Sequence, residues 1–313
     1  MRDLRSQLPI DSRSDFRLAS FTKQFTAMAV MLLVHDGKLR YDESLTAVFS
    51  GFPEYGKSIT IRNLLTHTSG LIDYETLIDK QFADKPWQEI PQIHDGDVLA
   101  LVKLQTATKF TPGTKWDYCN GGYVLLATIV EKTSGKPFGE FLRERIFQPL
   151  SMNRTLAYEY GKNVVPERAY GYTNDAGVWL ETDQSPTSAT LGDGGIYTSI
   201  QDLAKWDDAL RNHILLSANE MLPAITPVTL PGGTQPVPRA EDGKPSAYGF
   251  GSYLDPYDGH NRMWHSGGTI GFRTMIERFP DDNLTIIVLC NRTDLDPGAL
   301  SLKVADLFMK AKQ

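Results

Sequence analysis

One serine and one lysine near the start of the chain are spaced for nucleophilic chemistry. Ser20 and Lys23 form the only S-x-x-K pattern in the 313 residues. On a helix, side chains three positions apart share a face, with Cβ atoms about 5–6 Å apart. A lysine placed there can hydrogen-bond the serine hydroxyl, and burial lowers its pKa toward the range of a general base. We expect Ser20 to be a nucleophile that Lys23 activates.

A tyrosine and an asparagine form a second motif, Tyr118-Cys-Asn120. A phenolate next to a lysine ammonium can take the serine proton and pass it to a leaving group. The amide of Asn120 can hold Lys23 and a substrate carbonyl, although capping a helix is its simpler role. A rival match, Tyr172-Thr-Asn174, precedes Asp-Ala-Gly177 and is typical of a turn between polar strands. We therefore expect Tyr118 to be the functional tyrosine.

A third motif, His265-Ser-Gly-Gly268, follows an apolar stretch. Glycines beside a strand let a ligand approach the backbone closely, which makes Gly267 and Gly268 candidates for substrate contact. The backbone N–H groups of Gly268 and Ser20 are candidates for an oxyanion hole. Two other H-x-G matches, at His35 and His94, read as a helix end and a loop turn.

Apolar helices and a strand-rich C-terminal part must position these motifs. Helices are predicted over Ser20–His35, Gly121–Thr133, Phe138–Phe147, Leu203–Arg211 and Ala299–Lys312. Strands are predicted over Tyr248–Leu254, Arg262–His265, Phe272–Phe279 and Leu284–Asn291. Residues 73–96 read as a long irregular loop. The pattern predicts an α+β fold and one catalytic unit of two lobes. Residues 15–200 form the mainly helical lobe, and residues 201–313 with 1–14 form the sheet-and-helix lobe.

The three motifs occur in the order found in the class C β-lactamase-related serine hydrolases, which this chain resembles. The connecting segments are similar too: Phe16–Lys23, Arg62–Leu71, Thr111-Pro-Gly113 and Gly194–Thr198. The resemblance covers residue 10 to the end. It implies a β-lactamase/transpeptidase-like fold and a serine acyl-enzyme mechanism on esters, amides or lactams, with no metal or cofactor.

Two departures from the family pattern change the expectations. His265 stands where penicillin-recognising members carry lysine, and a histidine is mostly neutral near pH 7. Relatives also have two strands before the nucleophile helix, whereas residues 1–15 show no alternating apolar pattern. We therefore expect weak β-lactamase activity, and an uncovered sheet edge that pairs two copies of the chain into a dimer.

Other features exclude classes of function. The net charge is −6 and no Lys/Arg-rich run is present, so nucleic acid is not an expected partner. The longest apolar run, near Ala27–Val34, is too short to span a membrane. The start of the chain has no signal-peptide pattern, which would make a complete chain cytoplasmic. The two cysteines and six histidines show no disulfide or metal-binding pattern.

The sequence leaves three functions open. The first is an esterase on small acyl esters, with Asn120 and His265 orienting substrate. The second is a D-amino-acid peptidase or weak β-lactamase, and the third is a non-catalytic binding or scaffold homologue. A Ser-His-Asp mechanism is disfavoured because the chain has no G-x-S-x-G motif. His67 is therefore expected to be a hydrogen-bonded loop anchor rather than a general base.

Overall fold

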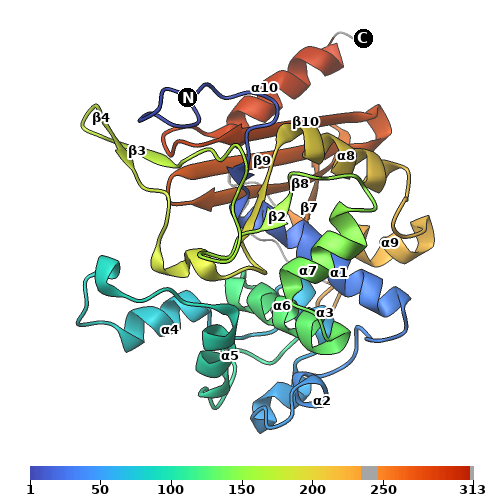
Figure 1. The fold of residues 1–313 in the computed structure, drawn as a ribbon. Helices are drawn as coiled ribbons and strands as arrows, with labels where there is room; N and C mark the ends of the chain where they lie inside the picture. The colour runs from blue at the N-terminus through green and yellow to red at the C-terminus, as the bar shows by residue number, and fades with distance from the viewer. Residues whose placement is uncertain (234–245, 311–313) are drawn as a thin grey trace.

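An antiparallel sheet covered on both faces by helices forms one part of the molecule, and a mainly helical part lies beneath it (Figure 1). The computed structural model describes residues 1–233 and 246–310. The sheet order is β10-β9-β8-β7-β6. This is the α+β architecture that the sequence predicts. The five strands are β6 (Ala247–Tyr248), β7 (Tyr253–Tyr257), β8 (His260–Thr269), β9 (Phe272–Phe279) and β10 (Leu284–Cys290).

The described residues form ten α-helices, which surround the sheet and build the mainly helical part beneath it. They are α1 (Lys23–His35), α2 (Leu45–Val48), α3 (Ile61–Leu65), α4 (Tyr74–Gln81), α5 (Asp95–Lys103), α6 (Asn120–Ser134), α7 (Phe138–Leu142), α8 (Ile200–Arg211), α9 (Ala218–Ile225) and α10 (Pro297–Lys310). Two small sheets complete the described fold: β1 (Phe16–Arg17), β5 (Ile196–Thr198) and β2 (Leu156–Ala157), then β3 (Tyr172–Asp175) with β4 (Val178–Glu181).

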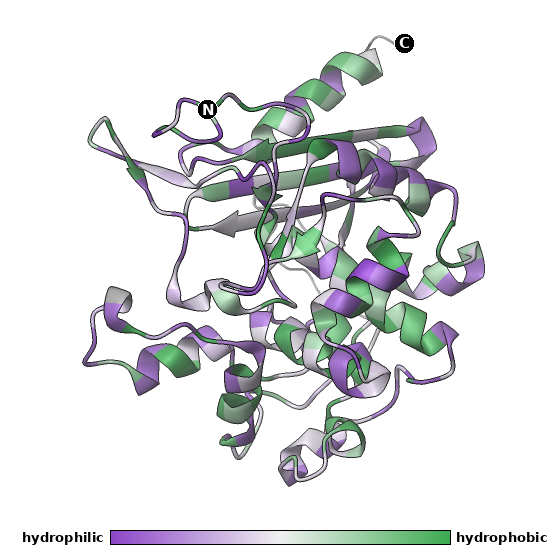
Figure 2. Cartoon of the chain, viewed as in Figure 1, coloured by the Kyte–Doolittle hydropathy of each residue, from purple (hydrophilic) through white to green (hydrophobic). Residues whose placement is uncertain are grey.

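Helix α1 lies at the centre of the molecule because it is apolar on nearly every side. Its residues from Lys23 to Leu33 are all buried, and it packs against α6 in the main hydrophobic core. Figure 2 shows hydrophobic colour along the sheet and through the central helices, with hydrophilic colour on the outer loops. Helix α6 ends at Gly135, whose φ of 71° is the left-handed conformation that a glycine cap supplies. The sequence predicts both helices and this stop.

Three predicted elements differ from those observed. The strand predicted over Tyr248–Leu254 is two strands, β6 and β7, separated by a turn at Gly251 (φ 70°). A side chain at Gly251 would place Cβ 2.8 Å from the Lys23 backbone oxygen, so this turn packs directly on α1. Strand β8 runs on through the glycines to Thr269 rather than ending at His265. The predicted loop 73–96 contains helix α4, capped by Asp73.

One edge of the sheet has no strand beside it in the described part of the chain. Strand β10 pairs only with β9, and residues 1–15 contribute isolated bridges rather than strands. The N-terminal segment instead reaches the end of β10, where Asn291 Nδ2 donates to the Met1 carbonyl at 3.1 Å. The open edge agrees with the expectation from the sequence. Pairing of two chains through it stays a prediction, which light scattering after size exclusion would test.

None of the described helices combines the length and the apolar character that crossing a membrane requires. The last two residues of the helix predicted over Ala299–Lys312 lie outside the described part of the chain.

Candidate active site

The nucleophile candidate Ser20 lies in a tight turn that leads directly into α1. Strand β1 pairs with β5 and brings the chain to Ala19, whose φ of 49° is in the left-handed region that non-glycine residues seldom adopt. A 3₁₀ turn, Ala19–Thr22, follows and continues as α1. Ser20 is partly exposed while Lys23 is completely buried. A substrate can therefore reach the hydroxyl, while the lysine behind it is shielded from water.

Lys23 connects the separate parts of the site. Its Nζ lies 3.0 Å from Ser20 Oγ, 2.8 Å from Asn120 Oδ1 and 3.1 Å from the Asp193 carbonyl oxygen. All three acceptors are uncharged, so no ion pair with a described residue compensates for the burial of the ammonium. Burial lowers the pKa of Lys23 to about 8, against the opposing effect of nearby carboxylates. A minority of Lys23 is then neutral near physiological pH, and this neutral form can act as a general base.

Tyr118 lies over the same lysine. Its ring centroid is 4.9 Å from Lys23 Nζ, and its hydroxyl interacts with Ser20. Burial raises the pKa of Tyr118 far above its usual value, although the hydrogen bond with Ser20 opposes this rise. The phenol is therefore protonated at neutral pH. A resting phenolate, which the sequence suggested, does not fit this environment, but a phenol that donates a proton does.

The asparagine of the second motif serves the lysine and not the helix end. The N-cap of α6 is Cys119, and the backbone N–H of Asn120 donates to Asp73 Oδ2 at 2.6 Å. This leaves the Asn120 side chain to accept from Lys23. The rival pair Tyr172 and Asn174 lies in the β3–β4 hairpin, as its turn pattern predicts.

The third motif borders the site along β8. A Cβ at Gly267 would lie 2.0 Å from the Leu18 carbonyl oxygen, so only glycine lets β8 pack against the segment that leads to Ser20. At Gly268 nothing lies closer than 3.8 Å to such an atom. The strand holding Gly268 packs on the turn holding Ser20, which is the arrangement that an oxyanion hole from their N–H groups requires.

His265 is committed to protein partners at both ring nitrogens. Nε2 lies 3.1 Å from the Tyr248 hydroxyl and Nδ1 lies 2.6 Å from the Ser266 carbonyl oxygen. Burial and the neighbouring Lys23 lower the pKa of His265 to about 3, so the ring is neutral. A hydrogen bond from this ring to substrate would have to replace an existing one. His265 therefore supplies no positive charge to the site.

Histidine 67 is a structural neighbour of the site. Its Nδ1 accepts from the Cys119 N–H at 3.1 Å, and its ring packs at a tilt of 30° against Tyr118, with centroids 4.2 Å apart. Burial and the charge of Lys23 hold the pKa of His67 well below its usual value. It fixes the loop that carries Tyr118, as the sequence analysis expects of an anchor.

Sequence reasoning missed three acidic residues beside Lys23. Asp73, Glu75 and Asp193 all favour the charged form of the lysine electrostatically. Asp193 is buried, and its Oδ2 accepts from the Tyr74 hydroxyl at 3.0 Å. Glu75 reaches solvent, while partial burial and the two aspartates raise its pKa to about 7. No local motif marks these residues, because the start of α4 and the loop before β5 bring them together.

The comparisons with known proteins agree with this geometry. A model of the family described as Beta-lactamase matches residues 1–307. The chain belongs to the Beta-lactamase family. It is 34% identical over 308 residues to penicillin-binding protein 4* of Bacillus subtilis, covering 93% of this chain and 64% of that protein. This member of the Beta-lactamase family therefore spans less than two thirds of the length of that curated relative.

Solved structures show the same fold. A penicillin-binding protein homologue from Pyrococcus abyssi, described as octameric, superposes with a TM-score of 0.82 at 26% identity, over 99% of this chain and 69% of that one. D-amino acid amidase from Ochrobactrum anthropi SV3, solved with L-phenylalanine, has a TM-score of 0.81 at 25% identity, over 100% of this chain and 88% of that one. The β-lactamase/transpeptidase-like fold and the assignment to a serine hydrolase family are thus confirmed.

Proposed function

We propose that this protein is an acyl-enzyme serine hydrolase that cleaves small amides and esters whose acyl part carries a free amino group. The observation that supports this most directly is the charge around Lys23. Three carboxylates act on that lysine, and the neutral His265 supplies no cation for a substrate carboxylate. Such a site attracts a substrate ammonium and repels a substrate carboxylate. The likeness to D-amino acid amidase points to the same class of substrate.

The geometry supports a defined sequence of proton transfers. Neutral Lys23 accepts the Ser20 proton across 3.0 Å while Oγ forms a bond to the substrate carbonyl carbon. The N–H groups of Ser20 and Gly268 stabilise the oxyanion. When the bond to the leaving group breaks, Tyr118 donates its proton to the departing nitrogen or oxygen and recovers one from Lys23. Water then attacks the acyl-enzyme by the same route in reverse and releases the acid.

Glu75 is the proposed contact for the substrate ammonium. Of the three carboxylates it is the one exposed to solvent, whereas Asp193 is buried and Asp73 accepts the Asn120 N–H. Its pKa of about 7 means that an approaching ammonium would also favour its ionised form. Glu75 would therefore recognise the charge without taking part in bond breaking.

Hydrolysis of short neutral esters is a second candidate, favoured by the neutral state of His265. Neither an acetate nor a butyrate ester needs a charged partner beyond the oxyanion hole. On this reading, short esters turn over faster than nitrocefin, whose carboxylate meets no cation at position 265. His265→Lys should then improve nitrocefin relative to p-nitrophenyl acetate.

A substrate panel separates these functions. D-alanine p-nitroanilide, its N-acetyl derivative, p-nitrophenyl acetate and nitrocefin are assayed with the parent protein and with Ser20→Ala. We expect kcat/KM for the free amine to exceed that for the acetylated compound by at least about tenfold, as removal of a charged contact implies. Glu75→Gln should reduce this ratio.

The control is Glu54→Gln, which alters an exposed carboxylate paired with Lys57 and should leave the ratio unchanged. A fluorophosphonate probe should label Ser20 in the parent and nothing in Ser20→Ala. Equal or better turnover of the acetylated substrate would refute ammonium recognition. Labelling of a different serine would refute the mechanism.

A further inference from the structure

A cavity of about 330 Å³ lies against α1. Gln24, Met28 and Met31 line it from successive turns of that helix, a spacing that places them on one helix face. Helices α8 and α9 and the ends of β8, β9 and β10 complete the wall. None of the residues that line the cavity belongs to the proposed catalytic group. The volume is at the lower end of the range for small-molecule sites.

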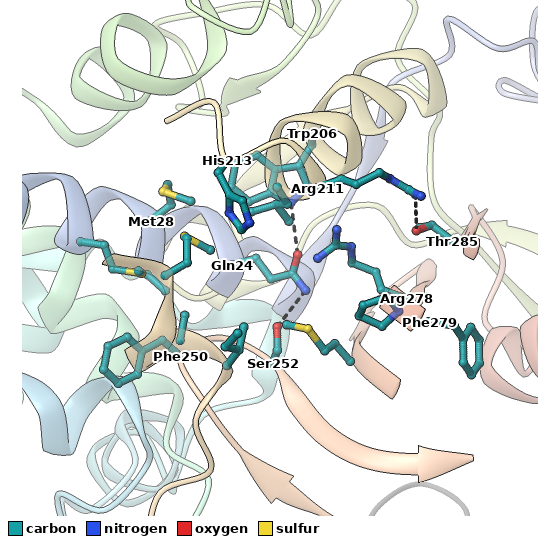
Figure 3. A pocket seen from close by; sticks show the side chains of 18 of the residues that line it. Gln24, Met28, Trp206, Arg211, His213, Phe250, Ser252, Arg278, Phe279 and Thr285 are labelled. Carbon is teal, nitrogen blue, oxygen red and sulfur yellow. Dashed lines mark hydrogen bonds between the residues drawn. The ribbon is translucent and has the colours of Figure 1, made fainter. Parts of the chain in front are cut away.

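Most of the cavity wall is apolar and adaptable. Four methionines line it, together with aromatic rings (Figure 3). Methionine side chains are flexible and polarisable, so they adjust to the shape of an aliphatic chain. The amide of Gln24 is already satisfied, because it accepts from Trp206 Nε1 at 3.2 Å and donates to Ser252 Oγ at 3.1 Å. This part of the cavity therefore suits hydrocarbon rather than a polar ligand.

One end of the cavity carries excess positive charge. Arg278 Nε and an Arg211 terminal nitrogen both donate to the single carboxylate of Asp207, each at 2.7 Å. Two guanidinium groups thus share one negative charge. The Arg278 side chain is 12% exposed and extends into the cavity (Figure 3). Its two terminal nitrogens make no hydrogen bond to any residue in the described ranges, so both can donate to an anion.

We propose that this cavity binds an aliphatic carboxylate of medium chain length. The carboxylate would accept hydrogen bonds from the terminal nitrogens of Arg278, a favoured geometry between guanidinium and carboxylate groups. The hydrocarbon tail would lie among Met28, Met31 and Met221. The volume excludes a whole phospholipid, and the methionines and aromatic rings that make up much of the lining favour a hydrocarbon tail over a sugar or a nucleotide.

Binding can be followed with the purified full chain and decanoate as the probe. Trp206 lines the cavity, so intrinsic tryptophan fluorescence reports occupancy, and isothermal titration calorimetry gives an independent affinity. Decanol and decylamine carry the same tail with a neutral or a cationic head. We expect decanoate to bind at least about tenfold more tightly than either, because a charge-assisted hydrogen bond is lost in both.

Two variants of lining residues and two control variants locate the site. Arg278→Gln should weaken decanoate about tenfold or more and leave decanol unchanged, while Arg292→Gln, at an exposed arginine paired with Asp294, should change neither. Ala224→Phe fills the apolar part and should weaken both ligands, which keeps the test open if Arg278→Gln does not fold. Ser20→Ala should bind decanoate like the parent.

Equal affinity for decanoate and decanol, or no effect of either cavity variant, would overturn the proposal. Loss of decanoate binding after fluorophosphonate labelling of Ser20 would place the ligand in the catalytic site instead, and would also overturn it. Because none of these measurements depends on hydrolysis, the outcome is independent of the function proposed above.

Discussion

Two buried cations of this protein have opposite surroundings. Lys23 has 0% of its surface exposed, and among the described residues its hydrogen bonds go to neutral oxygens of Ser20, Asn120 and the Asp193 backbone. Arg262 in β8 is 5% exposed and donates to Asp255 through two nitrogens, at 3.0 and 2.7 Å, with Glu277 on its other side at 3.5 Å. One cation is left without a direct ion pair, and the other is held between two carboxylates.

The difference separates a group that titrates from a group that holds structure. Burial without a paired carboxylate destabilises an ammonium, and the pKa of Lys23 falls to about 8. Arg262 is a guanidinium, which stays charged in proteins, and its bidentate pair with Asp255 also receives hydrogen bonds from Trp264 and Ser246. We infer that the first site is arranged for proton transfer and the second for joining β7, β8 and β9.

The largest effect should follow from removing the titrating cation. Lys23→Met takes away the proposed base, so kcat/KM for a p-nitrophenyl ester should fall by roughly 10²–10⁴-fold. The thermal midpoint should change little, because the lost hydrogen bonds are offset by relief of a buried charge. Lys57→Met, at an exposed lysine, is the control. Activity within tenfold of the parent would show that Lys23 is not the base.

Removing Arg262, the structural cation, should reduce stability and leave activity nearly unchanged. Arg262→Met leaves Asp255 and Glu277 buried without their guanidinium, which should lower the free energy of unfolding by about 3–5 kcal/mol. Urea denaturation measures this loss. The rate per fluorophosphonate-reactive molecule should stay within about twofold of the parent, because this cluster does not contact Ser20.

Arg292→Met tests whether burial of the ion pair causes the loss of stability expected for Arg262→Met. This exposed arginine pairs with Asp294, and its loss should cost less than about 1 kcal/mol. If Arg262→Met lowered the free energy of unfolding by equally little, the ion cluster would not be holding the strands together. A selective loss of activity without loss of stability would instead connect Arg262 to catalysis.

The sequence allowed the local parts of the site to be predicted and not its surroundings. Ser20 and Lys23 are three residues apart, so helical geometry alone brings them together. Strand β9 has the predicted bounds, Phe272–Phe279, because its apolar and β-branched pattern is local. The split at Gly251 was missed because it depends on contact with the Lys23 backbone, more than 200 residues away in the sequence.

The acidic surroundings of the site were missed for the same physical reason. Asp193 belongs to a loop whose path over α6 requires Gly192, where a Cβ would lie 2.3 Å from the Tyr123 carbonyl oxygen. The sequence shows the glycine, but it does not show that the chain passes close to the Tyr123 carbonyl oxygen at this position. The same holds for Asp73, whose contact with Asn120 joins two helix starts from different parts of the chain.

A third prediction concerns pH and separates the two cations further. Only neutral Lys23 can accept the Ser20 proton, so kcat/KM should rise about tenfold per pH unit below the pKa and level off above about 8. Arg262→Met should leave this profile in place while lowering stability. Fluorophosphonate labelling rates from pH 6 to 10 would show the profile without interference from substrate ionisation. A rate independent of pH across this range would contradict a lysine base.

The smallest effect should come from changing the field around Lys23 while leaving its hydrogen bonds intact. Ionised Glu75 favours the charged lysine, so Glu75→Gln should lower the apparent pKa of the labelling profile. Because Glu75 reaches solvent, we expect a shift of only a few tenths of a pH unit, which salt should diminish. Glu54→Gln, at an exposed glutamate paired with Lys57, should leave the profile unmoved. An upward shift of the apparent pKa in Glu75→Gln would mean that Glu75 does not act on Lys23 through its charge. The difference between Lys23, which titrates, and Arg262, which stays charged, would then rest on burial alone.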